Sequence, residues 1–190
     1  MAAALNLPAL ILPLFILLSC ALVWLCRRQL VNPRCHGFYR FFAFEGILWL
    51  LLNALPLWHH NILSLLQALS LLLMLLALGL LIGSLYQLRY HGGSVARQQA
   101  RENFSFENTN TLVTQGIYAY IRHPMYSSLL ALNWGVFLKR PTLDAMIVAV
   151  LVSLTLYLTA RHEERENCDF FGGDYRDYLK RSKMFVPLLW

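Results

Sequence analysis

The chain has 190 residues, of which 58% are hydrophobic and only 14% are charged, with a mean hydropathy of +0.50. This apolar content is well above that of an average soluble domain, so the composition excludes a soluble globular protein and predicts an integral membrane protein. The 16 Lys and Arg residues exceed the 10 Asp and Glu residues by a formal charge of +6. Such an excess fits binding to nucleic acid or anionic lipid, or simple orientation in a membrane, depending on where the charges lie.

Three apolar segments in the first half predict three membrane helices. Leu7–Cys26 carries no charge and is long enough, at about 1.5 Å per residue, to cross a hydrocarbon core of about 30 Å. It is followed by Arg27 and Arg28, and it lacks the preceding basic residues and the cleavage site of a signal peptide. We therefore expect a retained first helix with its N-terminus outside. The second and third spans are predicted over Phe41–Trp58 and Ile62–Leu85.

Two further apolar stretches, Tyr126–Leu138 and Leu143–Ala160, are separated only by "KRPT" and predict a helical hairpin. Counted from Pro124, the fourth element provides about 22 Å of helix, which is less than the hydrocarbon thickness of about 30 Å. We therefore expect Arg122 and His123 to lie at or within the inner interface, with the proline in the first turn of the helix. The predicted fold class is all-α, with about five membrane helices in one integral membrane domain.

The distribution of basic residues predicts the orientation. With the N-terminus outside, every Lys and Arg except Lys139 and Arg140 falls on the cytosolic side, as the positive-inside rule requires. The C-terminus and the candidate site would then be cytosolic. Membrane topology accounts for most of the positive charge, so nucleic acid is not expected as a partner.

Two other patterns predict packing rather than chemistry. Gly79 and Gly83 form a GxxxG motif in the third span, for which packing against a helix of the same chain is favoured over dimerisation. The cysteines form no CxxC pair and predict neither a disulfide framework nor a metal site. They are Cys20, Cys26, Cys35 and Cys168.

The hairpin brings two polar segments to one side of the membrane. The fifth element ends in "ARHEEREN" at Ala160–Asn167, and because the hairpin is tight this segment emerges near Arg122–Pro124. Chargeable side chains that are partly removed from water in this way form a candidate site. The residues expected to converge are Tyr118, Arg122, His123, Tyr126, Arg161, Glu163 and Glu164. The alternative is that both glutamates only pair with the two arginines at helix ends.

The segment after the hairpin, "FFGGDYRDYLKRSKMFVPLLW", predicts a turn at Gly172–Gly173 and then a short amphipathic helix. Its face with Tyr175, Tyr178 and Leu179 suits a helix that lies on the inner membrane surface, and suits equally a lid over the polar cluster. The polar loop over Tyr86–Thr111 is expected on the same side.

The last 80 residues or so resemble the isoprenylcysteine carboxyl methyltransferase and phospholipid methyltransferase superfamily of integral membrane enzymes. The resemblance is carried in order by "LVTQGIYAYIRHPMY" at Leu112–Tyr126, by Glu163 and Glu164, by "FFGGDYRDYLKR", and by the late Pro187. It implies transfer of a methyl group from S-adenosyl-L-methionine to a lipophilic or amphipathic small acceptor, or a lipidated one, that enters from the lipid side.

The resemblance also implies roles for individual residues. Those that match the cofactor pocket of the family are Leu112, Val113, Tyr118, His123, Pro124, Tyr126 and Glu163. Because the cofactor presents a carboxylate, an ammonium and a sulfonium, Arg122 is added as part of a cationic wall. Arg161 and Glu164 are the predicted catalytic residues. Within the single domain 1–190, residues 1–85 would then hold three spans, and 86–190 a cofactor-binding loop, the hairpin and the cytosolic C-terminal segment.

One position departs from the family. Carboxyl-methylating members have an arginine four residues before the first glutamate, where this chain has Thr159, and Arg161 lies about 200° away around a helix. This puts isoprenylcysteine in doubt as the acceptor. The alternatives are N-methylation of a phospholipid headgroup, an NADPH-dependent enzyme similar to sterol reductases, and a non-enzymatic membrane protein that recruits anionic lipid.

Overall fold

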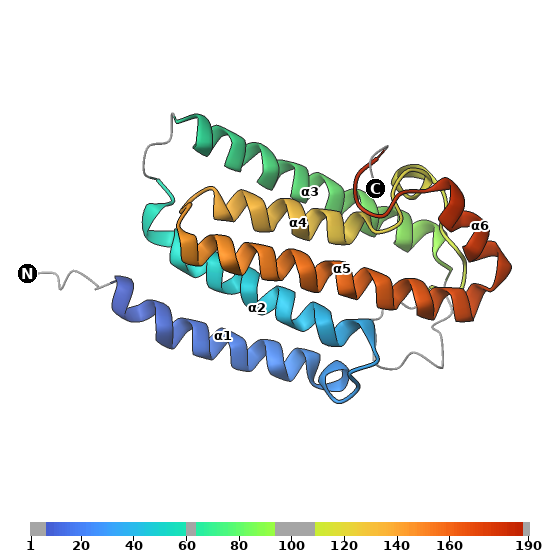
Figure 1. The fold of residues 1–190 in the computed structure, drawn as a ribbon, viewed down its shortest axis with the longest axis horizontal. Helices are drawn as coiled ribbons and strands as arrows, with labels where there is room; N and C mark the ends of the chain where they lie inside the picture. The colour runs from blue at the N-terminus through green and yellow to red at the C-terminus, as the bar shows by residue number, and fades with distance from the viewer. Residues whose placement is uncertain (1–6, 60–63, 94–108, 188–190) are drawn as a thin grey trace, which may run out of the picture.

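The computed structural model describes residues 7–59, 64–93 and 109–187 (Figure 1). Within these ranges it contains α-helices, two short 3-10 helices and no strand, which confirms the all-α fold class. The elements are α1 (Leu7–Leu30), α2 (His36–Ala54), η1 (Leu55–Leu57), α3 (Leu65–His91), η2 (Gly116–Ala119), α4 (Pro124–Phe137), α5 (Leu143–Phe171) and α6 (Gly173–Arg181).

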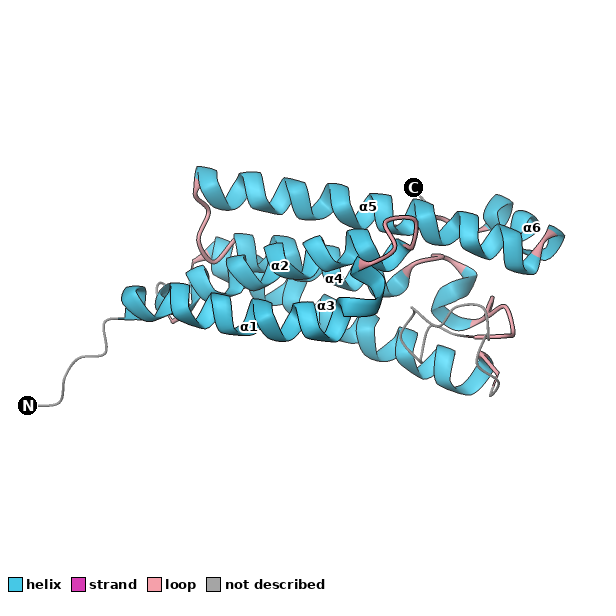
Figure 2. Cartoon of the chain, turned by 90° about the horizontal axis from the view of Figure 1, so that it is seen from below, coloured by secondary structure: helices cyan, strands magenta, loops and turns pink. Residues whose placement is uncertain are grey.

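The five longest helices lie side by side, and α6 lies at the end of the bundle where α5 projects beyond α4 (Figures 1 and 2). The central helix is α4, which packs against α2, α3 and α5, whereas α1 packs on the outer side of α2. At the end with α6, α5 and the last turns of α3 lie apart, with the η2 segment between them (Figure 2).

Small and polar side chains allow α4 to lie close to its neighbours. The Ser70 hydroxyl of α3 donates a hydrogen bond of 2.7 Å to the carbonyl of Gly135, where there is no side chain to hold the helices apart. On the opposite side, the wholly buried Asn133 amide donates to the carbonyl of Ala149 on α5 at 3.0 Å. Buried polar groups that are satisfied in this way are typical of helix contacts in membrane proteins.

Four of the described helical segments are long and apolar enough to cross a membrane, namely Leu10–Leu30, His36–Leu57, Leu65–His91 and Leu143–Phe171. The outer faces of α1 and α3 expose large apolar side chains such as Leu17 and Leu72, which would be unfavourable in water and suit lipid. The chain is therefore an integral membrane protein. With 14 residues, α4 is too short to span the hydrocarbon, since it provides about 21 Å of helix.

The predicted hairpin is confirmed, but α5 continues well past Ala160. Its polar extension contains no Gly or Pro, so the helix runs on to Phe171 and ends at Gly172, whose φ of 61° favours glycine. Similarly, α3 extends beyond the predicted Leu85 to His91. The predicted start of the third span at Ile62 lies outside the described residues, as does most of the polar loop, residues 94–108.

The expected packing of the GxxxG motif within the chain is wrong for the described residues. A Cβ atom built on Gly79 or on Gly83 would meet no atom within 4 Å beyond its own helix backbone. The face of α3 that packs on α4 instead carries Ser70, Ala77 and Ser84, which are buried. Gly79 lies about 180° and Gly83 about 140° away from Ser70 around the helix, so both face away from α4.

Candidate active site

The start of α4 is fixed by the segment that follows α6. Ile121 and Lys183 form an isolated parallel bridge, in which the amide of Arg122 donates to the carbonyl of Lys183 at 2.7 Å. Next to it, the amide of His123 donates to the carbonyl of Met184 at 3.2 Å. Pro124 then occupies the first turn of α4, as predicted. The motif at the helix start is therefore held by residues about sixty positions later in the chain.

The guanidinium of Arg122 is already bonded. Its Nε lies 2.8 Å from Oε1 of Glu164, and both side chains are almost buried, with 11% and 7% of their surfaces exposed. Its NH1 donates to the carbonyl of Ser182 and, at 3.4 Å, to that of Leu179. The pairing that sequence reasoning left as an alternative is thus present for these two residues, and the cation is neutralised on the side away from the cavity.

Glu163 occupies a different position from Glu164. It accepts a short hydrogen bond from the Tyr126 hydroxyl, and its Oε2 lies 3.9 Å from Nδ1 of His123. The other ring nitrogen of this histidine is 3.5 Å from Oε1 of Glu164. His123 is buried and stacks on Tyr126 at 5.4 Å between ring centroids. The histidine therefore links the two carboxylates, and only Glu163 borders the cavity.

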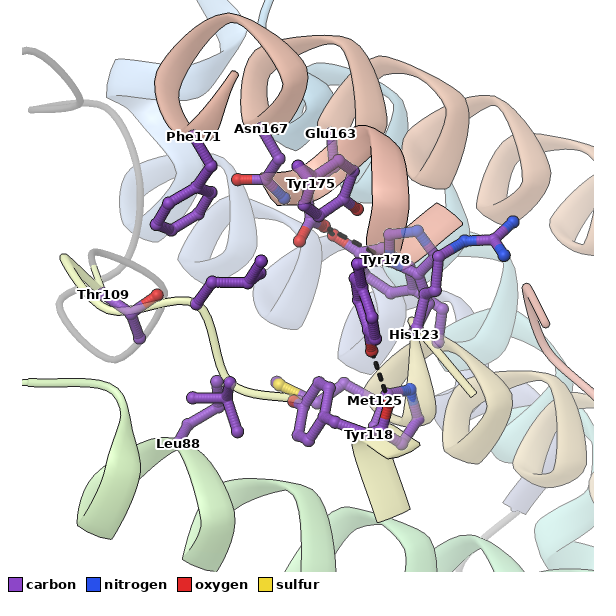
Figure 3. Close-up of a pocket in the computed structure, with 15 residues that line it drawn as sticks. Leu88, Thr109, Tyr118, His123, Met125, Glu163, Asn167, Phe171, Tyr175 and Tyr178 are labelled. Atoms are coloured by element: carbon purple, nitrogen blue, oxygen red, sulfur yellow. Dashed lines mark hydrogen bonds and ion pairs between the residues drawn. The ribbon is translucent and has the colours of Figure 1, made fainter. Parts of the chain in front are cut away.

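A cavity opens at this end of the bundle (Figure 3). Figure 3 shows Glu163, Asn167 and Tyr175 on one side of it, and Leu88 and Tyr118 on the other. The lining residues are Leu88, Thr109, Leu112, Val113, Tyr118, Arg122, His123, Pro124, Met125, Tyr126, Glu163, Asn167, Phe171, Tyr175 and Tyr178.

All eight residues predicted to bind the cofactor line this cavity, and the two predicted catalytic residues do not. The Glu164 carboxylate contacts Arg122 and His123 and does not line the cavity. The Arg161 guanidinium is half exposed, at 49%, and lies 3.6 Å from Oε2 of Glu164. Thr159 is wholly buried and its hydroxyl donates to the carbonyl of Thr155 at 2.7 Å, so it presents no polar group to an acceptor.

Several lining residues were not in the predicted set. Asn167 and Phe171 follow Glu163 at intervals of four, so the helical period of α5 would have found them once its extension was known. Tyr175 and Tyr178 belong to the predicted amphipathic face of α6 and line the cavity, as expected of a lid over the polar cluster. Leu88 has no signal in the sequence that sets it apart from other leucines of α3.

The wall formed by α6 is aromatic and uncharged. Burial raises the pKa of Tyr175, and the nearby Glu163 carboxylate raises it further. Burial also raises the pKa of Tyr178, whose hydroxyl donates to the carbonyl of Tyr118 at 2.6 Å. Both phenols therefore stay neutral at physiological pH. Among the described residues, the cavity combines five aromatic rings with one carboxylate, an arrangement that suits an organic cation.

The sequence of the chain is similar to those of several known methyltransferases. The chain is 29% identical over 73 residues to methanethiol S-methyltransferase 1 of Bradyrhizobium diazoefficiens, covering 37% of this chain and 24% of that protein. It is 36% identical over 88 residues to protein-S-isoprenylcysteine O-methyltransferase of Mus musculus, covering 43% and 29%. With the protein of the same name from Schizosaccharomyces pombe it shares 32% identity over 106 residues, covering 50% and 44%.

The chain thus spans less than half the length of each of these relatives. No solved structure gave a significant match. The sequence profile of the phospholipid methyltransferase family matches residues 65–169, from the start of α3 to near the end of α5, which is more than half the chain and includes Arg122, His123 and both glutamates. The chain therefore belongs to the phospholipid methyltransferase family.

Proposed function

We propose that this chain is an integral membrane methyltransferase that uses S-adenosyl-L-methionine, held in the cavity between α3, α5 and α6. The observation that carries the proposal is that five Tyr and Phe rings and the Glu163 carboxylate line one cavity. Aromatic faces and a carboxylate attract sulfonium and ammonium groups. The matched family and relatives are methyltransferases, which favours methyl transfer over the NADPH-dependent alternative.

The cofactor would supply an electrophilic methyl group on a sulfonium. The Glu163 carboxylate, held by the Tyr126 hydroxyl, would pair with one of its cationic groups. Tyr175 and Phe171 would pack against apolar parts of the cofactor and keep water out. Methyl transfer is an in-line displacement, so orientation of the two reactants and exclusion of water supply most of the catalysis.

The contacts of the two predicted catalytic residues suggest different roles. Glu164 acts as a positioning residue, because its carboxylate is bonded to Arg122 and lies next to His123. Arg161 lies outside the cavity lining, and its half-exposed guanidinium would support the Glu164 carboxylate from the outer side.

The acceptor is lipophilic or amphipathic, and the atom that receives the methyl group is uncharged, as in a thiol or an amine. An anionic acceptor needs a cation, and the lining residues in the described part of the chain include a single Lys or Arg, Arg122, which Glu164 already neutralises. Thr159 adds no charge. These contacts favour a soft neutral nucleophile over a carboxylate.

The cavity faces the cytosol and the N-terminus lies outside. Lys139 and Arg140 lie in the α4–α5 turn, at the end of the bundle opposite α6 (Figure 1). Arg27 and Arg28, in the last turn of α1, fall on the side of the cavity, as the positive-inside rule requires. Labelling of cysteines placed at 140 and 180 by an impermeant maleimide on intact cells tests this orientation. Only the residue 140 variant should react.

The cofactor is tested by binding of S-adenosyl-L-methionine to the purified protein in nanodiscs. We expect saturable binding in the wild type and in Lys180→Gln, which alters an exposed pair with Asp177. Glu163→Gln and His123→Ala should weaken it at least tenfold. Absence of saturable binding to the wild type, or equal binding by all variants, would contradict the proposal.

The acceptor is tested by incubating membranes that contain the protein with methyl-labelled S-adenosyl-L-methionine. Label in a lipid extract would indicate a lipid amine, label in a volatile fraction a small thiol, and base-labile label in protein a carboxylate. The last outcome would contradict a neutral acceptor without contradicting methyl transfer.

A further inference from the structure

The N-terminus of α2 is capped by a residue from another helix. Its N-cap residue, Cys35, makes no side-chain capping bond. Instead, Oε1 of Glu166 on α5 accepts a hydrogen bond of 2.9 Å from the amide of His36, and Oε2 lies 2.7 Å from Nδ1 of the same residue. Only 2% of the His36 side chain is exposed. The carboxylate therefore satisfies a helix amide that would otherwise be unpaired, and holds a buried imidazole at the same time.

A second contact joins the same two helices one turn away. The ring of Tyr39 on α2 stacks on the ring of His162 on α5, with centroids 4.5 Å apart and planes inclined by 22°. His36 and Tyr39 are three residues apart, and His162 and Glu166 are four apart, so each pair lies on one face of its helix. The first turn of α2 thus holds α5 at two points.

These contacts lie directly beside the wall of the cavity. Glu163 and Asn167, which line it, are the residues that follow His162 and Glu166 in the chain. In an α-helix, neighbouring residues differ by about 100° in direction. The contacts with α2 therefore fix the rotation of α5 about its own axis, and with it the direction of Glu163. Without them, this polar extension of α5 would be fixed mainly by its contacts with the α4 start (Arg122, His123 and Tyr126) and with α6.

We propose that His36 and Glu166 are positioning residues, which orient the cavity-lining face of α5 from outside the cavity. The inference rests on the proposed function only in that the cofactor is the ligand of the cavity.

Sγ of Cys35 lies within 4.8 Å of the possible metal-ligand atoms of His36 and Glu166. Because both oxygens of Glu166 already accept hydrogen bonds from His36, the cap accounts for the cluster of three residues.

The test compares disruptive with conservative variants of the full chain in nanodiscs. His36→Leu removes the imidazole, whereas His36→Asn retains a donor near the position of Nδ1. Glu166→Ala removes the cap, and Glu166→Gln retains an oxygen for the amide of His36. Asp169→Ala is the matched control, since Asp169 is an exposed acidic residue of the same helix.

Two measurements are made on each variant, namely the Kd for S-adenosyl-L-methionine and hydrogen exchange of residues 160–171. We expect His36→Leu and Glu166→Ala to raise Kd by about tenfold, the effect of losing a charge-assisted hydrogen bond, and to accelerate exchange in this segment. His36→Asn and Glu166→Gln should recover most of the affinity, and Asp169→Ala should match the wild type.

Unchanged exchange at residues 160–171 in both disruptive variants would overturn the inference, whether or not the wild type binds the cofactor. Absence of cofactor binding by the wild type would instead count against the proposed function. Wild-type affinity in those variants would also overturn it. So would an equimolar metal ion in the purified wild type that is lost in His36→Leu, because the cluster would then be a metal site rather than a helix cap.

Discussion

The Tyr126 hydroxyl of α4 donates a short hydrogen bond to the Glu163 carboxylate of α5, so two residues 37 positions apart form one wall of the cavity. This bond joins the two arms of the helical hairpin at the end opposite its turn. It fixes the direction of the carboxylate at the edge of the cavity.

Tyr126→Phe removes this donor and keeps the ring that stacks on His123. A charge-assisted hydrogen bond contributes about 1.5–3 kcal/mol to stability, so we expect a lower melting temperature and, because Glu163 loses its orientation, a higher Kd for S-adenosyl-L-methionine. Isothermal titration calorimetry in nanodiscs measures the effect. Tyr120→Phe, at an exposed tyrosine, is the control. Equal affinity in both variants would show that the hydroxyl does not position Glu163.

Arg122→Gln should destabilise the protein far more than Arg161→Gln. The first change leaves the Glu164 carboxylate buried without its main cation, and breaking a buried ion pair costs about 3–5 kcal/mol. The second removes a half-exposed partner at 3.6 Å, whose loss costs less than about 1 kcal/mol. Thermal unfolding in detergent compares the two. Similar melting temperatures would mean that Arg122 does not anchor the C-terminal segment.

Glycines on α3 and α4 should respond differently to alanine. A Cβ atom on Gly135 would lie 3.0 Å from Met74 Cγ and 3.2 Å from the carbonyl oxygen of Ser70, which cannot move without shifting α3. Gly135→Ala is therefore expected to lower stability by about 1–3 kcal/mol. Gly79→Ala meets no neighbour and should keep or raise the melting temperature, since alanine favours helix. A marked loss in Gly79→Ala would reveal a helix packed on this face in the membrane.

Alkaline pH should destabilise the protein through Tyr175 and Tyr178. Burial raises the pKa of both phenols in the folded state above the ordinary value of about 10. Their stabilising contribution is fully present below pH of about 10 and is lost as the pH rises towards the folded-state pKa, because only the unfolded chain ionises them there. Absorbance at 295 nm should show at least two of the nine tyrosines titrating only on unfolding. The double variant Tyr175→Phe, Tyr178→Phe should lose this late phase; an unchanged phase would contradict their burial.

The sequence predicted the helices because membrane spans are long apolar runs, and it predicted the start of α4 because proline restricts where a helix can begin. Seven of the eight proposed cofactor residues were selected because they match the motif of a known family, and Arg122 was added from the chemistry of the cofactor; all eight line the cavity. The direction of the Arg122 guanidinium could not be predicted, since its partners at Leu179 and Ser182 come from a segment whose path depends on tertiary packing.

The contact between His36 and Glu166 was missed for a related reason. The two residues are 130 positions apart, and no local pattern connects the start of α2 to the polar extension of α5. The packing of Gly79 and Gly83 was predicted wrongly because a small-residue motif indicates that a helix can approach, without indicating which helix does.

The dependence of the α4 start on Lys183 and Met184 sets an order of events during biosynthesis. Every apolar helix is translated before these residues, so the wall formed by α6 is completed after the membrane helices have been made. A transcript with a premature stop codon before Leu179 would therefore yield a protein whose Arg122 lacks both of these carbonyl partners. The cavity is consequently complete only after α6 has packed against the membrane helices. Finished chains would then bind a ligand there, whereas nascent chains in the same membrane would not.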